Sequence, residues 1–160
     1  MRSLVGRLTM SSFVILAAWC AQSASAQPPV HSVTGSGVVS VEGIVFRTTL
    51  AVHEDSDGGV WGVSIVLLDL SAFDLGKVTF RIEPTCLDVD GDSAWIGGIV
   101  THSTNEDIVP IGENDITLVR DLGKNGQDVM HNEPFPPGTL CTDRPEFLES
   151  VVDRGNFKVR

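Results

Sequence analysis

The 160-residue chain is predicted to fold as an all-β domain, an antiparallel β-sandwich or a small up-and-down barrel of about seven to eight strands with one short C-terminal helix. Two observations lead to this prediction. Apolar and polar residues alternate over segments such as 44–53, which is typical of half-buried antiparallel strands. Asp90-Gly91 separates two apolar arms, and Asp-Gly favours a tight β-hairpin because glycine accepts a positive φ.

The first 26 residues have the pattern of a secretory signal peptide. Two arginines are followed by an apolar stretch, and Ala24-Ser25-Ala26 matches the small-x-small cleavage rule. A lipoprotein signal that ends at Cys20 is the alternative, but the bulky Trp19 does not suit it. We expect cleavage after Ala26, one all-β domain over residues 27–160, and a secreted or periplasmic protein.

The charge balance limits the classes of partner. Removal of residues 1–26, which contain two of the 11 basic residues and none of the 21 acidic ones, leaves 134 residues with a net charge of −12. This charge repels phosphate backbones and anionic lipid surfaces, so nucleic acid is not an expected partner. The chain has no tyrosine for an aromatic girdle, so we expect no membrane insertion as a barrel. A protein or a small molecule remains as the candidate partner.

Cysteine usage predicts one disulfide. Cys20 leaves with the signal peptide, so Cys86 and Cys141 remain as a pair in an oxidising compartment. Free thiols or metal ligands are the alternatives, but the long separation and the lack of a CxxC motif favour the bond. It would stabilise the fold by about 4 kcal/mol and pin the C-terminal third of the chain onto the sheet.

The first half of the domain reads as three strands and a connection. Residues 33–41 predict a first strand at a sheet edge, because glycines interrupt it. Residues 60–68 are almost wholly apolar, so we expect both faces of that strand to be covered. We expect residues 70–75 to form a connection that is anchored by a buried Phe73. The strand at 44–53 directs one set of alternate residues inward: Ile44, Phe46, Thr48, Leu50 and Val52.

Around Pro84 the inward parity changes, which allows either a hairpin turn or one bent strand. Proline cannot adopt the positive φ of a two-residue hairpin turn, so we favour one long strand over 77–89 that bends at Pro84. Beyond the Asp90-Gly91 turn, the returning arm carries Gly97-Gly98, which permits a bulge or a close backbone approach.

The last third is predicted to be less regular. We expect a polar loop over 101–113, a short strand over 116–120, and an irregular segment over 121–138 with Phe135 as its apolar anchor. The spacing of four apolar residues predicts a helix over 145–152, and a closing strand is expected at 157–159. The four residues of the apolar helix face are Phe147, Leu148, Val151 and Val152.

The central hairpin resembles a group of uncharacterised exported bacterial all-β proteins that share a Cys-Leu-x-Val-x-Gly-x-x-Ala-Trp-Ile-Gly-Gly hairpin. Here the motif runs from Cys86 to Gly98, and the likeness continues through Val119-Arg120-Asp121 to residues 155–159. The chain departs from the pattern around Pro84 and over residues 122–138. The resemblance implies an exported all-β domain, and it implies no activity.

Three alternate carboxylates, Asp88, Asp90 and Asp92, form a weak candidate calcium site. The other ligands of a calcium loop are missing, so we favour a plain hairpin turn, no metal and no cofactor. His53 and His102 both close strands, but their spacing matches no zinc motif. Trp61 and Trp95 could stack on a sugar, although tryptophans on such strands are more often packed in a core.

No catalytic residue set is evident, because the chain lacks a GxSxG motif and a clear base partner. The function that we expect is therefore a non-catalytic exported domain, either structural or an interaction module. A small-molecule-binding barrel or sandwich, with residues 60–68 lining the cavity, is the alternative. A secreted hydrolase is the second alternative.

Overall fold

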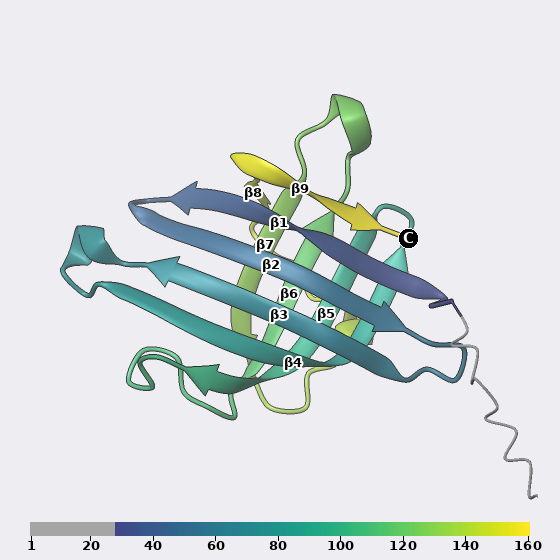
Figure 1. Cartoon of the computed structure of the whole chain (residues 1–160), viewed down its shortest axis with the longest axis horizontal. Helices are drawn as coiled ribbons and strands as arrows, with labels where there is room; N and C mark the ends of the chain where they lie inside the picture. Colours follow the sequence, from purple (N-terminus) through teal and green to yellow (C-terminus); the bar gives the residue numbers. More distant parts are fainter. Residues whose placement is uncertain (1–27) are drawn as a thin grey trace, which may run out of the picture.

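The computed structural model describes residues 28–160, so the expected signal peptide lies outside the described residues. Nine strands form one antiparallel sheet in the order β8-β7-β6-β5-β4-β3-β2-β1-β9 (Figure 1). The strands are β1 (His31–Val41), β2 (Ile44–Glu54), β3 (Val60–Asp69), β4 (Lys77–Asp90), β5 (Ser93–Ser103), β6 (Asn114–Arg120), β7 (Val129–Phe135), β8 (Ser150–Val151) and β9 (Arg154–Val159). Three 3₁₀ turns lie in the connections: η1 (Ser71–Phe73), η2 (Gly123–Asn125) and η3 (Cys141–Asp143).

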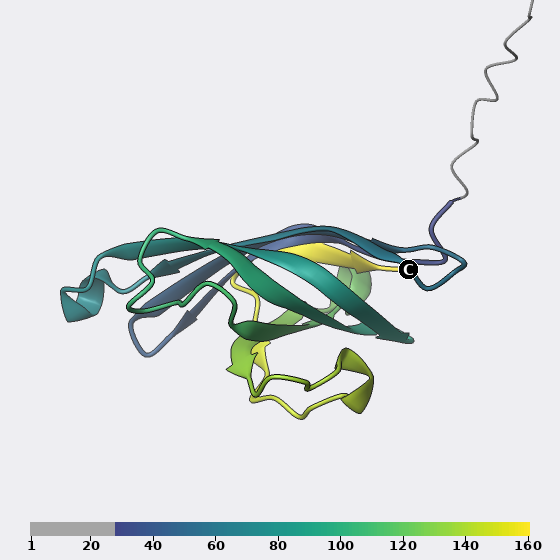
Figure 2. The ribbon, with the colours of Figure 1, turned by 90° about the horizontal axis from the view of Figure 1, so that it is seen from below.

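The sheet is curled into a half-barrel. In Figure 1, β1 to β4 cross in front of β5 to β7 at a steep angle, and Figure 2 shows the same two halves from below. The two outermost strands, β8 and β9, are consecutive in the chain, so the residues between them join the two edges. The Val152 amide donates to the Asp128 carbonyl, and the Asp153 amide donates to the Val38 carbonyl. One continuous barrel-like sheet therefore replaces the sandwich of two separate sheets.

The curl has a local cause in the β4–β5 pair. The register shifts between Arg81 and Ile82 and again between Pro84 and Cys86, and such bulges increase the twist of a sheet. Pro84 lies opposite Gly98, where an added Cβ would approach the Glu83 carbonyl oxygen to 2.5 Å. The prediction of one long strand bent at Pro84, facing glycines that permit close approach, is confirmed.

The inner face of the curled sheet holds the core. The inward residues of β2 follow the predicted alternation, with Thr48, Leu50 and Val52 buried. A second cluster lies under β3, β4 and β5, and the β5–β6 loop covers it with Val109. The larger cluster joins opposite parts of the sheet: Val33, Val39, Leu50, Val52, Leu87, Ala94, Ile96, Val119, Met130, Val152 and Phe157.

Three expectations for the first half are wrong. The first strand is no edge strand, because β9 pairs with it over Val33–Val38. Phe73 is 51 % exposed, and Leu70 is the buried residue of that connection. The outer face of β3 is not covered, since Trp61 is 54 % and Ile65 43 % exposed. All three errors concern the neighbours that a segment has in the folded protein. The residues of the segment itself do not specify these neighbours.

The last third differs more. Strand β5 runs on to Ser103, so the loop expected over 101–113 begins later. The segment 121–138 contains β7, which pairs with β6 along the whole length of both strands. The Asn132 side chain of β7 donates to Thr117 and Asp115 on β6, and the two strands pair although β7 lacks a regular apolar alternation.

Within residues 28–160 no α-helix is present, and the helix predicted over 145–152 is replaced by chain without regular secondary structure followed by β8. The segment instead makes contacts with the sheet, and these stabilise it more than the helix that its apolar spacing favours. The Trp95 indole donates to the Pro145 carbonyl oxygen at 3.3 Å, and the Phe147 ring lies 5.1 Å from the His131 ring. The expected apolar face is consequently split: Val152 is buried and Leu148 is 88 % exposed.

Cys86 and Cys141 form the predicted disulfide, with their Cα atoms 6.1 Å apart. Gly97 makes room for it, because a Cβ at that position would lie 2.6 Å from the Cys86 sulfur. Among the described residues, no helix has the length and apolar character needed to cross a membrane.

Candidate functional site

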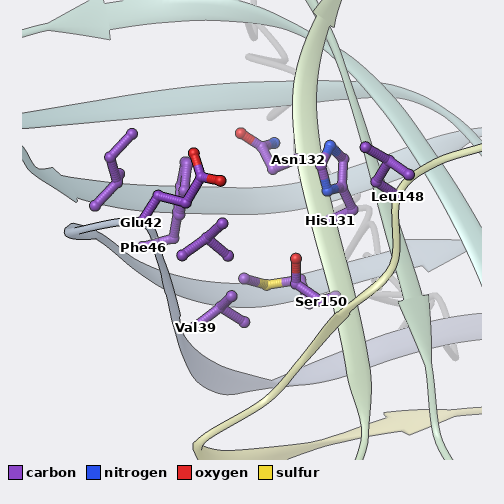
Figure 3. Close-up of a pocket in the computed structure, with 10 residues that line it drawn as sticks. Val39, Glu42, Phe46, His131, Asn132, Leu148 and Ser150 are labelled. Carbon is purple, nitrogen blue, oxygen red and sulfur yellow. The ribbon is translucent and has the colours of Figure 1, made fainter.

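The two edges of the curled sheet meet at one end and leave a gap at the other. In the described chain β7 pairs with β8 at Val129 and Met130 alone, and β1 pairs with β9 no further than Val38. Beyond these positions the ends of β1 and β7 border an opening in the wall. A cavity of about 240 Å³ lies in this opening (Figure 3). Its lining residues are Val39, Val41, Glu42, Ile44, Phe46, Met130, His131, Asn132, Leu148 and Ser150.

The walls of the cavity are mostly apolar. Val39 and Met130 belong to the buried core, and Phe46 packs against that core from β2. Leu148 is strongly exposed and lies at the rim. The β1–β2 turn supplies another rim residue, Glu42, which is held at a φ of 51° in a tight turn with Gly43. The cavity thus leads from solvent to the inner face of the sheet.

Asn132 supplies a polar group whose orientation is determined by β6. Its Nδ2 donates to the Thr117 hydroxyl at 2.8 Å and also to the Asp115 carboxyl. Thr117 is the cross-strand partner of Asn132, so both side chains share the inner face. With both amide hydrogens engaged, the side-chain oxygen of Asn132 points away from β7, toward the side lined by Glu42 (Figure 3).

Asp115 lies behind Asn132 and is 4 % exposed. Burial raises the pKa of Asp115 to about 8, and the neighbouring Glu113 and Glu133 add to the rise, whereas the hydrogen bond from Asn132 opposes it. A buried carboxyl without a cationic partner avoids the cost of desolvation by holding its proton. At neutral pH this inner wall therefore carries little charge.

The calcium candidates are occupied by a side chain of the protein itself. Arg144 donates through Nε to Asp88 and through Nη1 to Asp90, and the same guanidinium lies 5.3 Å from the Trp95 ring centre. Asp88 raises the pKa of Arg144, chiefly by its hydrogen bond. Asp92 accepts instead from the Ser93 hydroxyl. In the part of the chain that is described, no three His, Cys, Asp or Glu side chains form a metal-binding group.

The histidines and tryptophans named above are dispersed. The His53 ring lies 4.3 Å from the Trp61 ring on the outer face, and His102 is the cross-strand partner of Arg81. Trp61 is exposed, so the expectation that it packs in the core is wrong, whereas Trp95 is half-buried under the C-terminal segment.

Sequence reasoning located neither the cavity nor its polar group. Under the alternative of a ligand-binding barrel or sandwich, residues 60–68 would line the cavity, but the lining comes from β1, the β1–β2 turn, β2, β7 and the chain around β8. The sequence offers the two polar residues separately, Asp115 next to the apolar Ile116 and Asn132 between His131 and Glu133, and they come together only when β6 and β7 pair. Comparison of the chain with models of known protein families, with curated proteins and with solved structures found no match.

Proposed function

We propose that this chain is an exported, non-catalytic binding protein that takes a small, mainly apolar ligand with a hydrogen-bond-donating group. The observation that carries the proposal is the apolar cavity with Asn132 and Glu42 on its walls. Ligand sites are typically concave and apolar with a few oriented polar groups. The cavity is slightly smaller than the usual range of about 300–1,000 Å³, so it suits a small ligand or one end of a larger one.

The polar groups indicate the chemistry of the ligand. The amide hydrogens of Asn132 are engaged by β6, which leaves its oxygen as an acceptor, and Glu42 offers a carboxylate. Both therefore favour a ligand that donates hydrogen bonds, and Glu42 favours a cationic one. An alkyl or aryl amine combines such a group with an apolar body.

A hydrolase is less well supported, although Ser150 and His131 both line the cavity. Ser150 is the cross-strand neighbour of Met130, so the two side chains share the inner face, and His131 projects from the opposite face. The His131 ring is also engaged, with Nε2 lying 3.0 Å from Glu133. Among the described residues no hydrogen bond joins these two side chains, so the pairing of a nucleophile with its base is not formed.

Export remains part of the proposal. The disulfide is compatible with an oxidising compartment, and the expected signal peptide would deliver the chain there.

Thermal unfolding in the presence of three six-carbon probes tests the proposal. A ligand that binds only the folded state raises Tm, so n-hexylamine should raise it more than n-hexanol, and hexanoate should have little effect. Val41→Trp should fill the cavity from its exposed rim and abolish the response, whereas Val30→Trp, at an exposed position outside the cavity, should retain it. Equal responses of the two variants, or no response of the unaltered protein to any probe, would refute the proposal.

A further inference from the structure

The outer face of β3 is apolar and bare. Trp61, Val63, Ile65 and Leu67 alternate with the inward residues of the strand, so they share the outer face. A strand that is apolar on both faces is normally covered on both. Here Trp61 and Ile65 are about half exposed, and no described segment crosses them.

The long C-terminal connection does not cover this face. The chain from 136 to 149 is held by Cys86 on β4, Trp95 on β5 and His131 on β7. Figure 2 shows it below the β5–β7 half of the molecule, on the side away from β1, β2 and β3. The chain from residue 28 to residue 160 thus leaves this face of β3 bare.

Two arginines flank the apolar stripe. Arg47 on β2 is the cross-strand partner of Leu67, and Arg81 on β4 is the partner of Ile65, so both lie on the same outer face. Both are exposed, and neither takes part in the ion pairs found among residues 28–160. Val38 on β1 pairs with Arg47 on one side and with Arg154 of β9 on the other. Arg154 therefore adds a third arginine in line with Arg47 across the strands.

Few acids balance these cations. Glu83 lies two residues beyond Arg81, and Asp69 is already paired with Lys77 at 3.0 Å. The expected exported chain carries a net charge of −12, so a face with unpaired arginines runs against the charge of the molecule. Such local segregation of charge selects a partner of the opposite sign.

We infer that this surface, the β3 face (Arg47, Trp61, Val63, Ile65, Leu67 and Arg81), docks an acidic polypeptide that also presents apolar side chains. Its aliphatic centre needs an apolar counterpart, which a polypeptide supplies and a polyanionic glycan does not. Tryptophan and arginine are the residues that most often dominate binding energy at protein interfaces. A two-fold contact between copies would place arginines against arginines, so a symmetric dimer does not suit the face.

A peptide titration tests the inference. The probes are two synthetic peptides, (Glu-Leu)₄ and (Lys-Leu)₄, added to the exported protein and followed by calorimetry and by Trp61 fluorescence in a Trp95→Phe variant. The glutamate peptide should bind about tenfold or more tightly than the lysine peptide and shift the Trp61 emission to the blue. Calorimetry on the unaltered protein provides the result if Trp95→Phe loosens the C-terminal segment.

Matched charge reversals locate the binding. Arg47→Glu with Arg81→Glu should weaken binding of the glutamate peptide by about tenfold or more, whereas Lys124→Glu, an exposed cation on the β6–β7 loop, should leave it unchanged. The cavity-filling Val41→Trp should also bind normally, which separates this inference from the proposed function.

Equal loss in the Lys124 variant, or equal binding of both peptides, would overturn the inference. Tighter binding to polygalacturonate or to anionic vesicles, or self-association abolished by the two arginine substitutions, would overturn it in favour of a glycan, a membrane or a second copy.

Discussion

Two carboxyl groups of this protein show how local surroundings set a pKa. Asp69 lies at the end of β3, where hydrogen bonds from Ser71 and Lys77 lower its pKa to about 2. Asp115 lies inside the sheet, where burial raises its pKa to about 8. Asp69 therefore stays ionised over the range of about pH 5 to 9, whereas Asp115 titrates within this range. Of the two, only Asp115 makes stability depend on pH there.

We predict that Asp115 makes the fold less stable as pH rises. Between its ordinary pKa of 3.8 and about 8, the folded protein holds a proton that the unfolded chain releases. The stabilisation is thus complete below the lower value and is lost as pH approaches the higher one, at up to about 1.4 kcal/mol per pH unit. Urea unfolding at several pH values measures this slope. Asp115→Asn, which cannot titrate, should flatten it, and an unchanged slope in that variant would contradict the prediction.

At the scale of elements, the C-terminal segment is attached through a few points rather than through a continuous apolar face. The disulfide joins it to β4, Arg144 reaches Asp88 and Asp90, and the Pro145 carbonyl accepts from Trp95. The surface ion pairs contribute little, because exposed pairs are typically worth less than about 1 kcal/mol. The disulfide is consequently the main tie, and β7 does not depend on it, because β7 pairs with β6.

Replacement of both Cys86 and Cys141 by alanine should lower the free energy of unfolding by about 4 kcal/mol, because the reduced chain regains the freedom of the closed loop. Chymotrypsin should then cut first at Phe147 or Leu148, within the released segment, and β7 should remain protected. Urea unfolding and mass spectrometry of the fragments provide the two measurements. The unaltered protein with dithiothreitol is the control and should behave like the variant. First cleavage within β7 would contradict the prediction.

For the molecule as a whole, the closure of the curled sheet depends on side chains as well as strand pairing. One edge of β9 pairs with β1, and its other side meets carboxyl groups of the β6–β7 loop. Asp128 accepts from the Phe157 amide at 2.6 Å and from the Leu122 amide at 3.1 Å. Asp121 accepts from the Val159 amide at 3.4 Å. These bonds close one end of the seam, while the cavity occupies the other end.

Asp128→Ala should destabilise the protein by about 2–3 kcal/mol, because it leaves the buried Phe157 amide without an acceptor. The loss should be concentrated at β9, so hydrogen exchange of the Phe157 amide should accelerate more than that of the β2 and β3 amides. Asp57→Ala, at an exposed loop position, is the matched control and should change neither quantity much. Uniform acceleration over the whole sheet would show that Asp128 does not act as a local closure.

Local sequence determined much of the strand pattern. Alternation predicted β2 and its inward residues, Asp90-Gly91 predicted the central hairpin, and Pro84 predicted the bent β4. These features depend on neighbours along the chain, through backbone φ preferences and the two-residue period of a strand. The two remaining cysteines likewise predicted the disulfide, because only one pairing was available.

Tertiary structure alone decided what lies beside each segment. β7 formed from a polar segment because β6 offered it partners, and the expected helix at 145–152 was replaced by contacts with Trp95 and His131. The cavity joins β1 and β2 with β7 and β8, and the β3 face joins β2 with β4, so neither is contiguous in the chain. The physical reason is that the local propensity of a residue is worth about 1 kcal/mol or less, whereas pairing with distant strands and burial against them contribute more. Which distant strand a segment meets is determined only when the sheet curls.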